Sequence, residues 1–321
     1  MPRIKRLFLT EAEVDDLLDM DLALKALEEV FKARSAGEVY NQSRYRLPTG
    51  SGSYNFMSAT WPKRGFAGHK SYVAGPGGVN FHVMLYGTNG EGLIALLEAG
   101  RMGQVRTGAA SGVATNYMAR QNASTVGIIG SGYQAETQLE AVCAVRDITD
   151  VKVFSRQRVN REKFASDMAD RLGTKVVAVE SKENAAEGVD VLIAVTNSVE
   201  PVVTGQMLEP GMHVNAAGNN SWTKRELDTL AVRKADLIVC DDIEQAKIEC
   251  GELMQAAETG DFVWDSAVRL DTIVAGLKAS RLSDSDITLF ESQGVAFEDL
   301  AVCARLYELA LEQGIGTRLP D

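Results

Sequence analysis

Apolar residues recur at helical spacing near the start of the chain. Thr10 and Glu13 stand at the spacing of a capping box, and an acidic segment with leucines at positions 17, 18, 22, 24 and 27 follows them. An amphipathic helical region is therefore predicted from Thr10 to about Gly37. We assign it a scaffold role.

The pattern changes to short runs between residues 40 and 98, and Pro and Gly separate these runs. Runs of this length with such boundaries are typical of strands joined by turns, so an antiparallel sheet is predicted. The candidate strands are Arg44–Pro48, Ser53–Met57, Gly68–Val73, Phe81–Tyr86 and Leu93–Leu97.

From residue 125 onward, apolar runs alternate with helical patterns. Alternation of this kind predicts an α/β fold with a Rossmann-type doubly wound parallel sheet. Small residues between Gln104 and Arg120 predict a closely packed helix before the sheet, and a last helix is predicted from about Asp299 to Gln313. After the run that ends at Ile129, the candidate strands are Val151–Ser155, Lys175–Val179, Val191–Thr196, His213–Ala217 and Leu237–Asp241.

The run that ends at Ile129 leads into a glycine turn. Gly130, Gly132 and Ala135 have the spacing G-x-G-x-x-A, in which the second glycine lets backbone N–H groups approach a pyrophosphate at a helix N-terminus. Glycine turns before helices are common without a cofactor, but the strand before this turn and the helix after it favour a dinucleotide site. The predicted contacts are Gly130, Ser131, Gly132, Tyr133 and Gln134.

Composition narrows the class of protein. A chain of 321 residues, 45% apolar, is long enough for two domains with full cores. The net charge of −11, without a basic block, argues against a nucleic-acid or anionic-membrane partner. Four separated cysteines and three histidines form no zinc or disulfide pattern, so no metal is predicted and a cytoplasmic location fits. No apolar run reaches the ~18 residues of a membrane span, and the first ten residues lack a signal-peptide core.

Four motifs together resemble the ornithine cyclodeaminase/mu-crystallin family. They are Val105–Ser111, Gly130–Ala135, Pro210-Gly211 with Gly218, and Ser292–Asp299. The resemblance implies a homodimer. It also implies two domains. A substrate-binding and dimerisation domain of α+β type covers residues 1–117 and is completed by the C-terminal helix in residues 296–321, and a dinucleotide-binding domain covers residues 118–295. The resemblance also implies cofactor contacts at Thr107, Gly218, Ser292 and Gly294.

The same resemblance implies that Arg44, Lys70 and Arg106 hold the α-carboxylate of a substrate beside the nicotinamide. The chemistry is suitable, because an arginine grips a carboxylate with two hydrogen bonds and a lysine among cations can relay a proton. Arg46 lies on the same strand face as Arg44 and could exchange roles with it. The alternative for each basic residue is a solvated position on a sheet edge.

Further basic groups allow a hypothesis about the substrate. Arg46 and His69 could receive a second carboxylate, as in iminosuccinate; a surface ion pair for Arg46 and a core contact for His69 are equally good interpretations. With these two, Met57 and Asn220 complete the predicted substrate-binding set.

The end of the second predicted strand of the dinucleotide fold bears on the choice of cofactor. It has the sequence Ser155-Arg-Gln-Arg158 instead of the Asp or Glu that accepts from an NAD ribose. A hydroxyl with Arg156 and Arg158 suits a 2′-phosphate, so NADP(H) is favoured over NAD(H); stacking of Arg156 on adenine would suit either cofactor. Thr196, Asn197 and Ser198 are predicted on the nicotinamide side, with helix capping as the alternative.

Asn220 points to the reaction. In the cyclodeaminases that this stretch resembles, the matching residue is an aspartate that acts as a base, and an asparagine amide cannot do so. We therefore expect an NAD(P)H-dependent oxidoreductase that converts a small α-imino acid to an α-amino acid, with iminosuccinate to aspartate as one possibility. Two alternatives are a cyclodeaminase-type lyase with bound NAD and a non-catalytic binding protein like mu-crystallin.

Overall fold

The computed structural model describes residues 6–320. The prediction that the first ten residues lack a signal-peptide core therefore falls partly outside the described residues, because residues 1–5 are not among them. The chain forms two compact units: one runs to Arg106 and resumes at Val295, and the other is Thr107–Gly294. The first boundary falls inside the helix Gly100–Met118, whereas the sequence placed it at 117/118, one residue before that helix ends. The second falls one residue before the predicted position.

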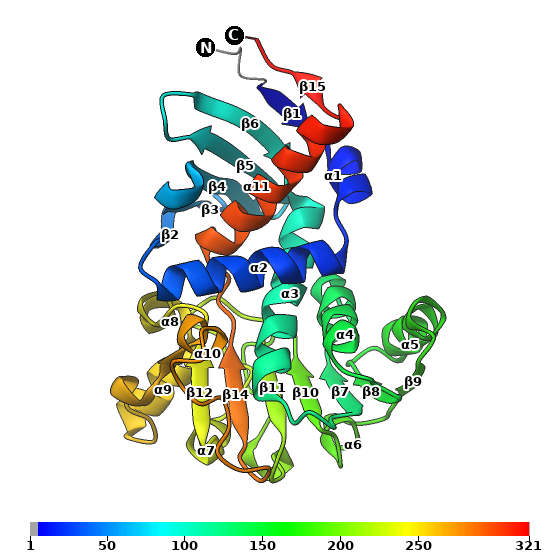
Figure 1. The fold of residues 1–321 in the computed structure, drawn as a ribbon. Coiled ribbons are helices and arrows are strands. Elements are labelled where there is room, and N and C mark those ends of the chain that lie inside the picture. The colour runs from blue at the N-terminus through cyan, green and yellow to red at the C-terminus, as the bar shows by residue number, and fades with distance from the viewer. Residues whose placement is uncertain (1–5, 321) are drawn as a thin grey trace. The chain divides into compact units, whose positions relative to one another are not determined.

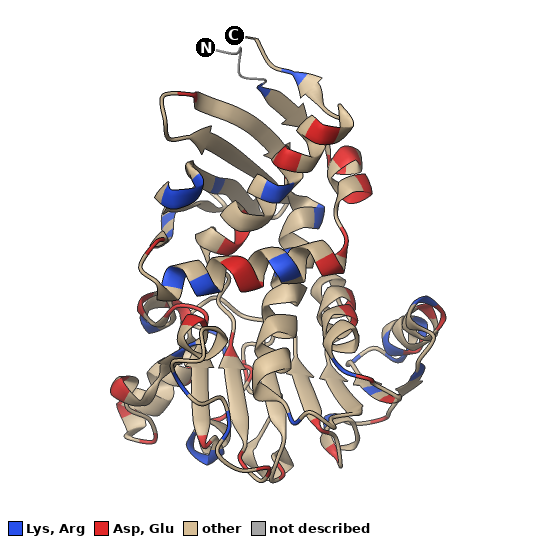
Figure 2. Ribbon diagram, in the orientation of Figure 1, with Lys and Arg blue, Asp and Glu red and all other residues tan. Residues whose placement is uncertain are grey.

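The helical region at the start is interrupted, so it forms two helices, α1 (Glu11–Leu17) and α2 (Met20–Ser35). The capping box is confirmed, because the Thr10 N–H donates to Glu13 Oε2 at 2.8 Å and Thr10 Oγ1 accepts from the Glu13 N–H. Leu18 is extended, and Asp19 caps the second helix by accepting from the Leu22 N–H at 2.8 Å. Figure 2 shows both acidic and basic residues along α2, which carries surface ion pairs at i,i+4 spacing.

The predicted antiparallel sheet is confirmed in the first unit. Its strands β2 to β6 pair in sequence order, and each is longer than its predicted core. Two short strands extend the sheet: β1 (Leu7–Leu9) pairs parallel to β6, and β15 (Thr317–Arg318) pairs with β1. The meander strands are β2 (Tyr40–Thr49), β3 (Gly52–Trp61), β4 (Phe66–Gly75), β5 (Gly78–Gly87) and β6 (Gly92–Glu98), with a 3-10 turn η1 (Pro62–Arg64) between β3 and β4.

Helix α11 (Ala296–Gln313) packs with α2 over this sheet (Figure 1). Phe31 of α2 and Phe297 of α11 meet edge to face, with ring centroids 5.4 Å apart. The helix begins three residues earlier than predicted, so Glu298 and Asp299 lie in its first turn and are buried. The C-terminal helix thus completes the N-terminal unit, as expected.

The helix predicted from its small residues is α3 (Gly100–Met118). A Cβ at Gly108 would lie 2.3 Å from the Thr137 carbonyl oxygen of α4 (Tyr133–Val145). Only glycine allows this approach, which explains Gly108.

The second unit is built on an eight-stranded sheet in the order β13-β12-β14-β11-β10-β7-β8-β9, with every neighbouring pair parallel. The predicted Rossmann-type sheet is confirmed, and β13 and β14 add strands that were not predicted. The strands are β7 (Thr125–Ile129), β8 (Asp150–Phe154), β9 (Lys175–Ala178), β10 (Val191–Ala194), β11 (His213–Ala216), β12 (Leu237–Cys240), β13 (Val268–Arg269) and β14 (Thr288–Glu291).

The central strands of this sheet are buried on both faces. In β10, Leu192 and Ala194 belong to one hydrophobic core, while Val191 and Ile193 belong to the other. The segments between strands form α4, α5 (Arg158–Leu172), α6 (Lys182–Ala186), α7 (Thr229–Lys234), α8 (Ile243–Glu249), α9 (Gly251–Thr259) and α10 (Leu270–Val274), with 3-10 turns η2 (Gly205–Met207) and η3 (Trp264–Ser266). Within residues 6–320, no helix has the length and hydropathy of a membrane span.

Candidate functional site

A cavity of about 710 Å³ opens at the carboxyl ends of β7, β8, β10 and β11 in the second unit. This is the edge of a doubly wound sheet where ligands bind, because the chain leaves neighbouring strands in opposite directions there. The cavity is lined by residues 129–134, 154–157, 160, 195–198, 202 and 218.

The glycine turn has the geometry that a dinucleotide needs. Gly130 has φ +121°, and a Cβ there would lie 2.2 Å from the Val195 carbonyl oxygen, so the strand must end in glycine. A Cβ at Gly132 would meet no protein atom within 4 Å, so protein packing alone does not require this glycine. Gly132 is the N-cap of α4 and lines the cavity. The open space beside helix N–H groups therefore fits a phosphate.

The structure brings together most of the predicted cofactor residues. Ser131 donates to Ser155 Oγ at 2.8 Å, which ties the glycine turn to the end of β8. No Asp or Glu is among the residues that line this cavity. The predicted residues that line it are Gly130, Ser131, Gly132, Tyr133, Gln134, Ser155, Arg156, Thr196, Asn197, Ser198 and Gly218.

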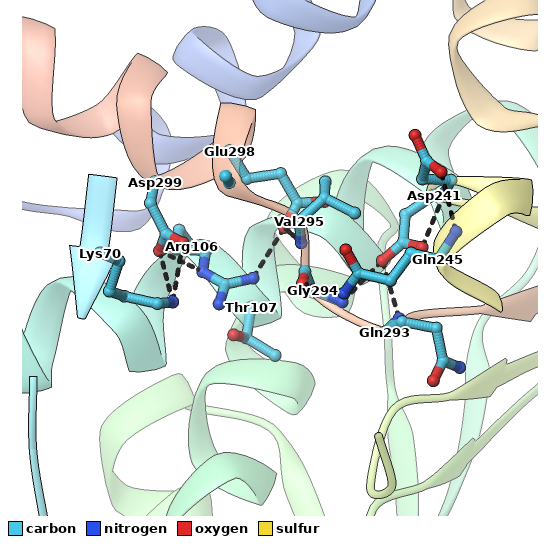
Figure 3. Close-up of polar contacts among 12 residues, drawn as sticks. Lys70, Arg106, Thr107, Asp241, Gln245, Gln293, Gly294, Val295, Glu298 and Asp299 are labelled. Atoms are coloured by element: carbon cyan, nitrogen blue, oxygen red, sulfur yellow. Dashed lines mark hydrogen bonds and ion pairs between the residues drawn. The ribbon is translucent and has the colours of Figure 1, made fainter. Parts of the chain in front are cut away.

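Other predicted cofactor residues do not line the cavity. Arg158 pairs with Glu162 at 2.6 Å on the exposed face of α5. The Thr107 carbonyl accepts from Gln138 Nε2 at 3.1 Å. The Ser292 N–H donates to the Ala216 carbonyl, and the Gly294 N–H donates to Asp241 Oδ2 at 2.7 Å (Figure 3). Their roles as cofactor contacts remain predictions.

Two polar residues that the sequence interpretation missed line the cavity. Asn160 Nδ2 donates to Gln157 Oε1 at 3.1 Å at the start of α5. Gln157 and Asn160 could have been found from their position, because they follow Ser155 and Arg156 in the loop and first helical turn after the second strand of this fold.

The first unit holds a buried cluster of charges. Lys70 on β4 is 3% exposed, and its Nζ lies 2.9 and 2.7 Å from the two carboxylate oxygens of Asp299. Arg106 Nη1 lies 2.7 Å from Glu298 Oε2, and its Nε lies 2.8 Å from Asp299 Oδ1. Figure 3 shows Lys70 and Arg106 pointing toward Asp299 from β4 and α3.

Burial governs the protonation of this cluster. It lowers the pKa of Lys70 to about 7, helped by the positive charges of Arg106 and Arg44 and opposed by Asp299. Burial also raises the pKa of Glu298.

Arg44, 6% exposed on β2, is close enough to Lys70 to affect its pKa, so the three predicted basic residues come together. Glu298 and Asp299 were missed as site residues. Their sequence signal was weak, because two acidic residues in a first helical turn are usually solvated caps.

The remaining predicted substrate residues differ in their placement. Met57 is buried and pairs in register with Lys70. Arg46 is exposed on β2, and Asn220 is exposed in the segment after β11. His69 does not join the cluster, because successive side chains of β4 point to opposite faces. The centroid of its ring lies 4.9 Å from that of Phe56 and 5.9 Å from that of Tyr86. Burial lowers the pKa of His69.

Comparison with known proteins matches residues 4–314 to the ornithine cyclodeaminase/mu-crystallin family. The structure is similar to Delta(1)-pyrroline-2-carboxylate reductase of Thermococcus litoralis in complex with NADH and L-proline, with a TM-score of 0.94, 34% identity and coverage of 98% of this chain and 100% of that one. It is similar to an archaeal alanine dehydrogenase dimer with bound NAD (TM-score 0.92, 36% identity, coverage 98% and 99%). It also resembles the iminosuccinate reductase of Paracoccus denitrificans in complex with NAD+ (TM-score 0.93, 26% identity, coverage 99% and 100%).

Proposed function

Because the chain belongs to the ornithine cyclodeaminase/mu-crystallin family, we propose that it reduces a small α-imino acid to the α-amino acid with NAD(P)H. The resemblance predicted from the motifs is confirmed. The protein is an NAD(P)-dependent oxidoreductase of carbon–nitrogen bonds, the class to which the similar dehydrogenase and reductases belong.

The observation that carries the proposal is the buried cluster around Lys70. Arg106 and Arg44 offer planar donors for the α-carboxylate of the substrate. Lys70, with its pKa lowered to about 7, can give a proton to the imine nitrogen at neutral pH. Asp299 accepts a hydrogen bond from Lys70 and forms an ion pair with Arg106, and it thereby fixes their positions.

The cofactor, when bound, supplies the hydride that adds to the imine carbon. We propose that the turn at Gly130 and Gly132 holds its pyrophosphate and that residues 196–198 and Gly218 lie along the nicotinamide end. The chain's own contribution to the step is the proton from Lys70 and the orientation of the carboxylate.

We keep NADP(H) as the proposed preference on one observation: Ser155 and Arg156 line the cavity and no carboxylate does. The similar structures were determined with NADH, NAD or NAD+ and give this preference no support.

For the substrate we favour a monocarboxylic imino acid. His69 lies on the opposite face of the sheet from Lys70, and Arg46 is exposed, so neither is buried with the cluster as a partner for a second carboxylate. Iminosuccinate remains the second candidate, since one similar structure is an iminosuccinate reductase.

The experiment is a panel of keto acids with ammonia or methylamine, and of cyclic imino acids, each with NADH and NADPH and followed at the absorbance of the reduced cofactor. We expect turnover of a small α-imino acid. Stoichiometric proline from ornithine and NAD+ without any imine reduction would favour the lyase and overturn the proposal. Cofactor binding without turnover of any member would favour the mu-crystallin-like binding protein.

We also propose a homodimer, the state of the similar archaeal alanine dehydrogenase. Leu47, Tyr54 and Val73 pair in register across β2, β3 and β4 and are 48%, 36% and 54% exposed. An exposed apolar row on a sheet face is typical of a surface that another chain covers. A cytoplasmic location, where the four free cysteines stay reduced, completes the proposal.

A further inference from the structure

A buried carboxylate joins two of the segments that line the dinucleotide cavity. Glu226, in the segment between β11 and α7, is 1% exposed. Its Oε1 accepts from the Thr196 N–H at 2.6 Å and from Thr196 Oγ1 at 2.7 Å, and its Oε2 accepts from the Gly218 N–H at 2.6 Å. Thr196 follows β10, Gly218 follows β11, and both line the cavity.

The approach of these segments is as close as the backbone allows. A Cβ at Gly218 would lie 2.3 Å from both the nitrogen and the carbonyl oxygen of Thr196, and 2.4 Å from Glu226 Oε2. The backbone of Glu226 is also held in place, because its carbonyl oxygen accepts hydrogen bonds from the N–H groups of Val202 and Val203 at 2.8 and 2.9 Å. Glu226 thus ties the segment after β10 to the segment after β11 through both its side chain and its backbone carbonyl.

Burial and neighbouring acids disfavour a negative charge on Glu226. The groups that act on it electrostatically include Glu252 of α9 and Glu291 of β14, which are also buried acids. Burial raises the pKa of Glu226 to about 8, with hydrogen bonds from Thr196 and Gly218 in opposition. The position is unfavourable for a negative charge. What suits a glutamate here is its two oxygens, which face hydrogen-bond donors on opposite sides.

We propose that Glu226 is a positioning residue that holds Thr196 and Gly218 in the arrangement that receives the nicotinamide end of the cofactor. The inference rests on the proposed cofactor site. It predicts that the carboxylate acts on cofactor affinity through the two loops, without touching the imino acid or the cofactor.

Glutamine is the sharpest substitution at this position. With its amide oxygen toward Thr196, the Glu226→Gln side chain would place an NH2 against the Gly218 N–H, and the flipped amide would place it against the Thr196 N–H. Two donors would then face each other in either orientation. Size and shape are kept, so the effect reports on the hydrogen bonds and the charge of the carboxyl group and not on packing.

The test measures the Kd of NADH and NADPH for the full-length protein by fluorescence of the reduced nicotinamide, without substrate. We expect Glu226→Gln to raise the Kd at least ~10-fold, on the scale of losing one or two buried hydrogen bonds. The control is Glu291→Gln, which removes another buried carboxyl of this unit whose side chain accepts instead from the Cys250 thiol at 3.4 Å. The control should stay within about 2-fold of wild type, well below one tenfold step.

An unchanged Kd in Glu226→Gln, or an equal rise in both variants, would overturn the proposal. If Glu226→Gln does not fold, Glu226→Asp takes its place. The shorter acid keeps the carboxyl group but reaches only one of the two loops, and the same outcomes decide. Because the measurement contains no imino acid, a wrong substrate assignment leaves it untouched, whereas a wild-type protein that binds neither cofactor overturns both proposals.

Discussion

Lys70 makes the reaction depend on pH at the scale of one residue. Its pKa of about 7 means that the ammonium, which donates the proton for imine reduction, is lost as pH rises through 7. The kcat/KM for reduction should therefore fall above pH 7, and that for amino-acid oxidation, which needs the neutral amine as base, should rise. Rates of both directions between pH 5 and 10 check this.

Substitution identifies the group responsible. Lys70→Met should lower kcat/KM at least ~100-fold and abolish this limb of the profile, because general acid–base catalysis contributes about that much. Cofactor affinity, which belongs to the other unit, should survive. The control is Lys63→Met, an exposed lysine 2.5 Å from Glu38 in the same unit. A pH limb that persists in the Lys70 variant would assign it to another group.

Arg156, in the loop before α5, and Arg158, the first residue of α5, provide a matched pair at the scale of an element. Arg156 lines the cavity, while Arg158 pairs with Glu162 one helical turn later. Arg156→Ala should weaken NADPH binding by ~1–3 kcal/mol, the scale of a charge-assisted bond to phosphate, and leave NADH nearly unchanged. Arg158→Ala should change neither Kd. Equal Kd values of the wild type for NADH and NADPH would contradict a 2′-phosphate site.

Helix α3 tests close packing with two glycines. Gly108→Ala should destabilise the protein by ~1–3 kcal/mol, because the added methyl overlaps the Thr137 carbonyl of α4. Gly103→Ala in the same helix meets no atom within 4 Å and should stabilise it by ~0.5–1 kcal/mol. Urea unfolding measures both, and a destabilising Gly103→Ala would show that the small residues there serve another purpose.

The length of a helix or strand decided whether it could be predicted from the sequence. Long periodic segments were predicted correctly, since burial of one face leaves a clear pattern in β2 to β6 and in α11. Strands β13 and β15, of two residues each, leave no period at all. The extended Leu18 broke the first helix although both sides continue the apolar spacing. Asp19, an N-cap residue, was the available signal.

At the scale of the whole molecule, the site also contains residues that could be predicted from the sequence and residues that could not. The glycine turn could be predicted, because only glycine fits its backbone. Lys70 and Arg106 came from the family resemblance. Their partners Glu298 and Asp299 are separated from them by about two thirds of the chain, and only the fold reveals that these acids are buried. Glu226 was missed for the same reason, since its partners at 196 and 218 meet it only across the carboxyl ends of β10 and β11.

The assembly state is tested on the exposed row Leu47, Tyr54 and Val73. Leu47→Glu with Val73→Glu places two charges on a surface that a second copy would desolvate, which disfavours association by several kcal/mol. Light scattering at micromolar concentration should give twice the chain mass of 34.7 kDa for wild type and the single mass for the variant. Leu282→Glu, at a side chain 89% exposed in the other unit, is the control and should remain dimeric. A monomeric wild type, or a double variant that keeps the dimer mass, would show that this row is not the dimer surface.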